Sequence, residues 1–307
     1  MNRDLLKNSI TGVYNILPPS APLAGASPPV PLVFDSPHSG RCYPPDFDYS
    51  CDDNLLRRGE DNHVDELFDF APKLGIPLLC AEFPRTYIDA NRALDDIEPE
   101  ILADRWPAPL NPTDRAHTGI GLIRRYIKPG IHVYSRKLSA AEIQERIDRY
   151  YVPYHHALAC LIENARHIGH GQVWHLNMHS MPSLGAVAPF PRLSRRINNG
   201  QPDFVLGDRN GTTCLPEFTR AVRDHLKSLG YNVTVNTPYK GVELVRRFSD
   251  PLSGRYSLQI EINKALYWDE RKLVKNRNFN ALKADLQALS EWLVTYTNAQ
   301  IQPIAAD

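Results

Sequence analysis

The sequence has no excess of charge of either sign and no long run of basic residues. It contains 35 Lys and Arg and 35 Asp and Glu in 307 residues, so its formal net charge is zero. Proteins that bind nucleic acid through phosphates, or membranes through a polybasic surface, concentrate positive charge. We therefore expect no nucleic acid and no membrane as partners, and a small polar substrate instead.

Long apolar runs, a leader segment and paired cysteines are also missing. No stretch reaches the roughly 18 apolar residues that a membrane helix needs, and the first residues lack the apolar core of a secretory signal. The five cysteines are widely spaced and form no C-x-x-C pair, which favours reduced thiols and excludes an all-cysteine metal site. These absences predict a soluble cytoplasmic protein.

Common catalytic and nucleotide-binding motifs are absent, whereas proline is abundant. The chain has no phosphate loop, Rossmann glycine fingerprint, Gly-x-Ser-x-Gly elbow or His-Glu-x-x-His helix. Of its 26 prolines, nine fall between Pro18 and Pro45, which predicts an extended N-terminal arm over about residues 1–30. A second Pro-rich segment, about residues 95–130, predicts a long excursion that forms a lid or side wall. No composition break marks a linker, so we expect one domain over residues 1–307.

Short apolar segments alternate with amphipathic ones along the rest of the chain. Strands are predicted at 30–35, 76–81, 172–178, 231–235 and 257–262, and helices at 52–74, from Ser139 onward, at 216–229 and at 271–297. Ser139 and Glu142 form a capping box, and Pro153 should kink the helix that follows. Strands separated by helices predict an α/β fold with three layers, α/β/α, around a central, mainly parallel or mixed sheet.

Two histidines follow predicted strands, where α/β sheets form crevices. His38 lies in the loop Ser36-Pro-His-Ser-Gly40, and His179 lies at the exit of the strand at 172–178. Alternation along that strand places His175 on the same face as His179, and we interpret His175 as a hydrogen-bonded core residue. His38 and His179 could supply two nitrogen ligands to zinc, and a carboxylate would complete a catalytic site.

The sequence pattern alone does not choose that carboxylate. Helical spacing leaves four acidic candidates near the His38 loop, which are Glu60, Asp61, Asp65 and Glu66. Glu261 differs from them because it interrupts an apolar strand. It either lies on an outward polar edge or faces a crevice, where burial would raise its pKa and suit it to take a proton from water.

A third polar segment follows the second predicted strand and carries positive charge. Arg85 and Arg92, with Asn91 nearby, could bind a carboxylate through forked hydrogen bonds. One of these arginines could instead pair with Asp89. Arg246 is a further basic candidate with a weaker signal.

Taken together and in this order, these segments resemble the N-formylglutamate amidohydrolase (N-formylglutamate deformylase) family. They span about residues 30–265 and comprise Ser36-Pro-His-Ser-Gly40, Glu60-Asp-Asn-His63, Arg85-Thr-Tyr-Ile-Asp-Ala-Asn-Arg92, Pro153-Tyr-His155, Asn177-Met-His-Ser180, Gly207-Asp-Arg-Asn-Gly211, Tyr239-Lys-Gly241 with Arg246, and Leu258-Gln-Ile-Glu261. The family is similar to zinc carboxypeptidases, which implies a phosphorylase/hydrolase-like α/β/α architecture.

The resemblance also implies roles for individual residues. The ligands it implies for one zinc ion per chain are His38, Asp61 and His179. The substrate-binding residues it implies are Arg85, Asn91, Arg92, Ser180 and Arg246. Glu261 would be the catalytic residue that activates water. The carboxypeptidase spacing His-x-x-Glu is absent, because Arg41 stands at its last position, so Glu60 remains the alternative to Asp61.

The activity that the resemblance implies is hydrolysis of the formyl amide of N-formyl-L-glutamate to formate and L-glutamate, a step of histidine degradation. The substrate would thus be a small acidic N-acyl amino acid. The first alternative is a zinc amidohydrolase or deacylase that acts on another N-acyl amino acid or a peptide end. The second is a non-catalytic protein that binds a small acidic ligand on the same fold. The sequence leaves the oligomeric state open.

Overall fold

The centre of the molecule is a seven-stranded mixed sheet. The computed structural model describes residues 9–20, 28–128, 130–183 and 201–301, and within them the strand order is β1-β3-β2-β6-β9-β7-β8. The strands are β1 (Tyr14–Leu17), β2 (Leu32–Ser36), β3 (Leu78–Ala81), β6 (Val173–Met181), β7 (Phe204–Gly207), β8 (Val233–Val235) and β9 (Arg255–Asn263). Strands β3, β2, β6 and β9 are parallel, whereas β1 and β7 run antiparallel to β3 and β9.

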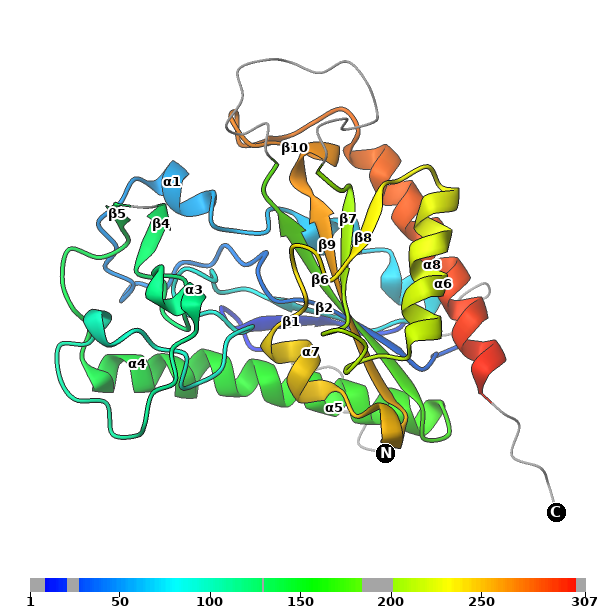
Figure 1. Cartoon of the computed structure of the whole chain (residues 1–307), viewed down its shortest axis with the longest axis horizontal. Helices are drawn as coiled ribbons and strands as arrows, with labels where there is room; N and C mark the ends of the chain where they lie inside the picture. The colour runs from blue at the N-terminus through cyan, green and yellow to red at the C-terminus, as the bar shows by residue number, and fades with distance from the viewer. Residues whose placement is uncertain (1–8, 21–27, 129, 184–200, 302–307) are drawn as a thin grey trace.

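Helices cover both faces of the sheet, as the sequence predicted (Figure 1). The long helices are α4 (Ala140–Arg146), α5 (Val152–Ile168), α6 (Pro216–Ser228) and α8 (Phe279–Gln300). Because neighbouring strand residues point to opposite faces, Phe34 packs in the core with α6 and α8, and Val33 packs in the core with α4 and α5. The three-layer α/β/α prediction is therefore confirmed.

The remaining elements are short. They are α1 (Asp53–Arg57), α2 (Val64–Leu67), α3 (Asp114–His117), α7 (Glu243–Phe248), β4 (Tyr126–Lys128), β5 (Ile131–His132), β10 (Trp268–Asp269) and β11 (Val274–Lys275). None of the helices in the described part of the chain combines the length and the apolar character needed to cross a membrane.

The predicted helix over residues 52–74 is wrong. The segment contains α1, α2 and a 3-10 turn, Ala71–Leu74, and His63 adopts a left-handed backbone with φ of 58°. Gly59 lies so close to another part of the chain that a Cβ there would be 2.7 Å from the Arg124 guanidinium. The apolar spacing is genuine, but tertiary contacts break the helix and lead residues 58–63 into the interior.

Three further expectations need correction. The arm over residues 1–30 contains an edge strand, because β1 pairs with β3 from Tyr14↔Ala81 to Leu17↔Leu78. Helix α8 begins at Phe279 and not at residue 271. In place of a break at Pro153, a π-helical turn, Ile147–Tyr151, joins α4 to α5. Pro153, which has no backbone N–H to donate, is the second residue of α5 and lies just after this turn.

The segment at 95–130 forms a side wall beside the sheet, around α3 and β4 at the left of Figure 1. Buried Ile97, Leu122 and Ile123 anchor it to the core that includes α4 and α5. Arg115 and Arg124 from this segment line the main cavity of the molecule. The segment thus contributes two arginines to the wall of that cavity.

Candidate metal centre and active site

The candidate residues meet where parallel strands end at the same edge of the sheet. His38 follows β2, and His179 and Glu261 lie near the ends of β6 and β9. The register pairs His179 directly with Glu261. Asp61 reaches this edge from the loop after α1, where its N–H donates to the carbonyl of His38 at 3.0 Å and its own carbonyl accepts from Ser39 Oγ at 2.8 Å. Strand ends and one loop thus assemble the site.

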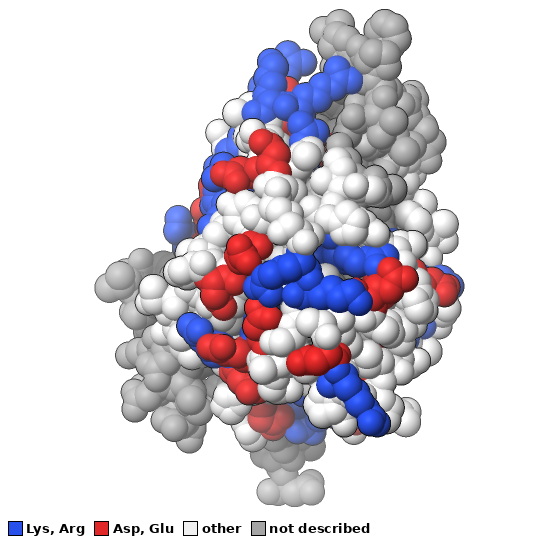
Figure 2. All heavy atoms as spheres, turned by 90° about the vertical axis from the view of Figure 1, so that its left-hand side faces the viewer, with Lys and Arg blue, Asp and Glu red and all other residues white. Residues whose placement is uncertain are grey.

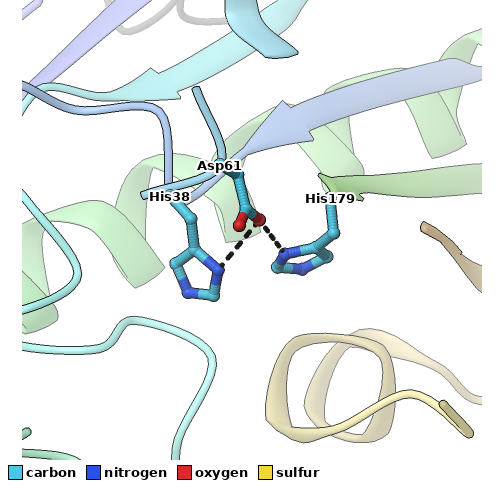
Figure 3. A group of neighbouring side chains, drawn as sticks. All are labelled: His38, Asp61 and His179. Carbon is cyan, nitrogen blue, oxygen red and sulfur yellow. Dashed lines mark hydrogen bonds and ion pairs between the residues drawn. The ribbon is translucent and has the colours of Figure 1, made fainter. Parts of the chain in front are cut away.

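His38, Asp61 and His179 form a compact buried group (Figure 3). One ligand atom from each lies within 4.8 Å of the others. Oδ2 of Asp61 is 3.4 Å from Nδ1 of His38 and 3.0 Å from Nδ1 of His179. Figure 3 shows the two rings on either side of the carboxylate, each with a nitrogen turned toward it.

The opposite nitrogen of each ring is held by an acceptor. Nε2 of His38 lies 2.7 Å from Oδ1 of Asp89, and Nε2 of His179 lies 2.7 Å from Oδ1 of Asn177. Nδ2 of Asn177 donates to Asp35 at 2.8 Å, which fixes the amide so that its oxygen faces His179. Because a carboxylate only accepts, Asp89 assigns the ring proton of His38 to Nε2 and leaves its Nδ1 as the lone-pair nitrogen. Nε2 of His179 lies between the acceptor Asn177 and a donor, Nδ2 of Asn91 at 3.0 Å.

This donor set fits a divalent metal ion. Nδ1 of His38 is buried and has no hydrogen-bond partner among the described residues, which is costly for a polar atom unless a ligand engages it. Two neutral imidazole nitrogens and one carboxylate oxygen are the ligands of many catalytic zinc sites, and outward hydrogen bonds from the histidines are their usual supports.

Charge around the group favours ionised carboxylates. Arg85 places Nη1 3.3 Å from Asp61 and Nη2 2.8 Å from Asp89. Burial opposes ionisation of Asp61, but its close contacts with His179 and His38 and the charge of Arg85 outweigh burial and hold the pKa of Asp61 well below its ordinary value. Arg85 therefore makes the predicted pair with Asp89 and a second contact with Asp61.

Glu261 lies in the crevice and not on an outward edge. It is 8 % exposed and lines the same cavity as the two histidines. Its Oε1 accepts a hydrogen bond from Nε2 of Gln259 at 2.8 Å. Burial raises the pKa of Glu261, and the neighbouring charge of Asp61 adds to this effect, although His179 opposes it. A raised pKa makes the ionised carboxylate a stronger base.

The cavity beside these groups has a volume of about 470 Å³ and a cationic lining. Seven cationic side chains face three carboxylates among the described lining residues, namely Arg58, Arg85, Arg92, Arg115, Arg124, Lys240 and Lys264 against Asp61, Glu261 and Glu270. The outer surface is different, because Figure 2 shows acidic and basic side chains interspersed on the face that carries α1, α3, β4 and β5. The lining therefore suits an anionic ligand.

Four of the five expected substrate-binding residues line this cavity. They are Arg85, Asn91, Arg92 and Ser180. Nδ2 of Asn91 lies 3.0 Å from Nε2 of His179, and its Oδ1 accepts from the backbone of Leu244 at 2.8 Å. The structure does not bring Arg246 to the cavity, because this side chain is 57 % exposed and pairs with Glu243 at 2.6 Å. Arg246 lies on α7, whose own acidic residue satisfies it locally.

Several cavity residues were missed from the sequence. Arg115 and Arg124 lie in a segment without apolar periodicity, and Arg58 lies where the predicted helix over 52–74 does not continue, so nothing indicated where these side chains point. Asp89 was considered only as a partner of an arginine, yet it also supports His38. The interpretation of His175 as a core residue is confirmed, since it is 1 % exposed and bonds Ser257 and Asp35, each at 2.9 Å.

Comparisons with known proteins agree with this geometry. The sequence model of the N-formylglutamate amidohydrolase family matches residues 30–268. An N-formylglutamate deformylase of Pseudomonas putida is 26 % identical over 274 residues, which cover 86 % of this chain and 93 % of the relative. The crystal structure of N-formylglutamate amidohydrolase from Ralstonia eutropha JMP134 is 42 % identical, with a TM-score of 0.85, and covers 94 % of this chain and 100 % of that one. A gene product of Agrobacterium tumefaciens, 15 % identical with a TM-score of 0.61, shares the fold over 95 % of this chain and 96 % of its own. The chain belongs to the N-formylglutamate amidohydrolase family.

Proposed function

We propose that the protein is a metal-dependent hydrolase that cleaves the formyl amide of N-formyl-L-glutamate into formate and L-glutamate. The observation that carries the proposal is a buried His-Asp-His group with inward Nδ1 atoms beside a carboxylate of raised pKa, in a cavity with a cationic lining. Membership of the family, and relatives named for this reaction, support the same substrate.

The residues that would hold one zinc ion are His38, Asp61 and His179. Such an ion supplies a Lewis acid that polarises the formyl carbonyl and lowers the pKa of water. Asp61 fits the ligand role better than Glu60, because the Glu60 carboxylate points away to the hydroxyl of Tyr43 and the side chain of Asn62.

Glu261 would move the proton. It takes a proton from the attacking water while the water oxygen bonds to the formyl carbon, and it passes that proton to the amide nitrogen as the carbon–nitrogen bond breaks. The register of β6 and β9 supports this role, because it places Glu261 beside His179 at the strand spacing of about 5 Å. The product formic acid then releases the remaining proton of the attacking water and leaves as formate, while the free amine takes up one proton.

Substrate binding would rest on the cations of the lining. Asn91 and Arg92 would hold the carboxylate next to the amide, through a forked contact that fixes its orientation. Arg85 would add positive charge from a fixed position, because Asp61 and Asp89 already hold it. Ser180, at the end of β6, lines the same wall.

The test is release of formate by the purified full chain from N-formyl-L-glutamate. We expect turnover that a chelator removes and zinc restores. A parallel panel of N-formyl and N-acetyl amino acids distinguishes this substrate from other N-acyl compounds. If the metal-bound protein released neither formate nor acetate from any of these compounds, the result would contradict the proposal and favour a non-catalytic binder.

A further inference from the structure

Arg124 is a buried cation without a counterion. It is 9 % exposed and lines the cavity, and its guanidinium makes no hydrogen bond or ion pair with any residue in the described part of the chain. Other buried arginines are satisfied. Arg92 pairs with Asp96 at 3.4 Å, and Arg146 donates to the carbonyl of Tyr87 at 3.0 Å and to a tyrosine hydroxyl. A buried charge without a partner is costly, so its position requires a reason.

A second arginine with an unsatisfied buried nitrogen lines the same cavity. Arg58 lines the same cavity, and its Nε is buried without a hydrogen-bond partner among the described residues. The next residue, Gly59, is the point of closest approach, because a Cβ at this position would lie 2.7 Å from Nη1 of Arg124. The absence of a side chain at Gly59 thus lets Arg124 reach the loop that carries Arg58. Two cations in the lining of one cavity favour an anion within it.

The surroundings of Arg124 add positive charge. Burial and the neighbouring charges of Arg85 and Arg92 together lower the pKa of Arg124 to about 9, although Asp89 and Asp61 oppose this effect. The guanidinium stays charged at neutral pH. Arg85 is already held by Asp61 and Asp89, which leaves Arg124 and Arg58 with free donors for a ligand.

We propose that Arg124, with Arg58 from the same cavity lining, binds the side-chain carboxylate of the N-formyl amino acid and makes the enzyme selective for an acidic side chain. The inference rests on the proposed function, in which Asn91 and Arg92 hold the other carboxylate. A dicarboxylate then engages both ends of the cationic lining. Guanidinium groups suit this role because their forked donors match a carboxylate, and an uncharged side chain would leave the buried cations unpaired.

The experiment compares two substrates of nearly equal shape, N-formyl-L-glutamate and N-formyl-L-glutamine, in the full metal-loaded chain. We expect Arg124→Met to lower kcat/KM for the glutamate substrate by about 100-fold or more and to change that for the glutamine substrate by less than about threefold. Arg124→Lys should recover part of the preference, because it keeps the charge but not the fork. Arg125→Met is the matched control, since the neighbouring Arg125 pairs with Glu98 and Glu100.

Equal loss for both substrates in Arg124→Met, with the lysine variant no better, would overturn the inference and indicate a structural role. An unchanged preference would overturn it too. A separate titration of L-glutamate and L-glutamine does not depend on turnover, and here Arg124→Met should abolish tighter binding of glutamate. Suppose that the wild type releases no formate but binds glutamate more tightly than glutamine, and that Arg124→Met removes this difference. The proposed reaction then fails while the carboxylate site stands. If the wild type binds both amino acids equally, the site fails.

Discussion

Replacing Glu261 with glutamine tests the proton-transfer step directly. The change is nearly isosteric, and the oxygen of the new amide can still accept the hydrogen bond that Gln259 donates at 2.8 Å. Because the buried side chain keeps its size and this hydrogen bond, its neighbours should keep their positions. What the variant loses is a base whose pKa burial has raised. We therefore expect full metal content and near-normal stability, with turnover strongly reduced.

The size of the loss follows from the neighbours of Glu261. General-base catalysis contributes about 10²–10⁴-fold, which is roughly 3–5 kcal/mol of activation free energy. No other carboxylate among the described lining residues is free to substitute. Asp61 is engaged with both histidines and Arg85, and Glu270 is held by the backbone and hydroxyl of Ser183. The upper part of the range is therefore expected.

The assay is formate release together with metal analysis of the same sample. The wild-type rate should rise with pH through a pKa above the ordinary value for glutamate, as Glu261 loses its proton, and this limb should vanish in Glu261→Gln. Glu243→Gln is the matched control, because Glu243 is also buried but lies outside the cavity lining. Turnover within tenfold of wild type, or loss of the metal, would refute the assignment.

Three further predictions concern the residues that support the site. Asp89→Asn should weaken metal binding by about 10–100-fold in a chelator competition, because the charged partner of His38 is lost. Burial lowers the pKa of His155 to about 4, so the unfolded chain takes up its proton first as pH falls. The free energy of unfolding should then drop by about 3 kcal/mol from pH 6.5 to 4, a slope that His155→Gln removes in urea titrations. Asp35→Asn should cost about 3–5 kcal/mol in the same titrations, because Asp35 ion-pairs with His175 and accepts from two other side chains.

Two of these predictions have an internal control. His156 is exposed and adjacent to His155, so His156→Gln should keep the wild-type pH slope. Asp203→Asn removes a buried carboxylate outside the cavity lining and should leave metal affinity unchanged. Unaltered metal affinity in Asp89→Asn, a wild-type slope in His155→Gln, or a loss below about 1 kcal/mol in Asp35→Asn would each contradict the corresponding reasoning.

The strand-borne half of the site could be predicted because its determinants are local. Apolar residues alternate with polar ones along β6 and β9, and this period of two assigns His179 and Glu261 to one face. Parallel neighbours align their carboxyl ends at one edge of the sheet. The two assignments together place His179 and Glu261 at the same edge of the sheet without any knowledge of loops, and the observed register adds that the two residues are direct neighbours.

The loop-borne half could not be predicted in the same way. Asp61 lies in a stretch whose apolar spacing favours one continuous helix, yet the backbone departs from it at Gly59 and His63. At Gly59 the backbone lies against Arg124, which is 65 residues away in the chain. A pattern of neighbours along the sequence holds no information on such a contact. The choice of Asp61 depended on resemblance for this reason, and Arg124 was missed altogether.

The zero net charge now has a structural explanation. With seven cations and three carboxylates in the cavity lining, the rest of the chain carries 28 basic and 32 acidic residues. Exposed charges beyond about 10 Å are largely screened by salt, whereas buried ones are not. A neutral protein can therefore offer a strongly positive interior to a small anion without attracting polyanions to its surface. Asp61, Asp89 and Arg85 would use part of that buried charge to fix the metal ligands, and Arg124 and Arg58 in the same lining would recognise the substrate.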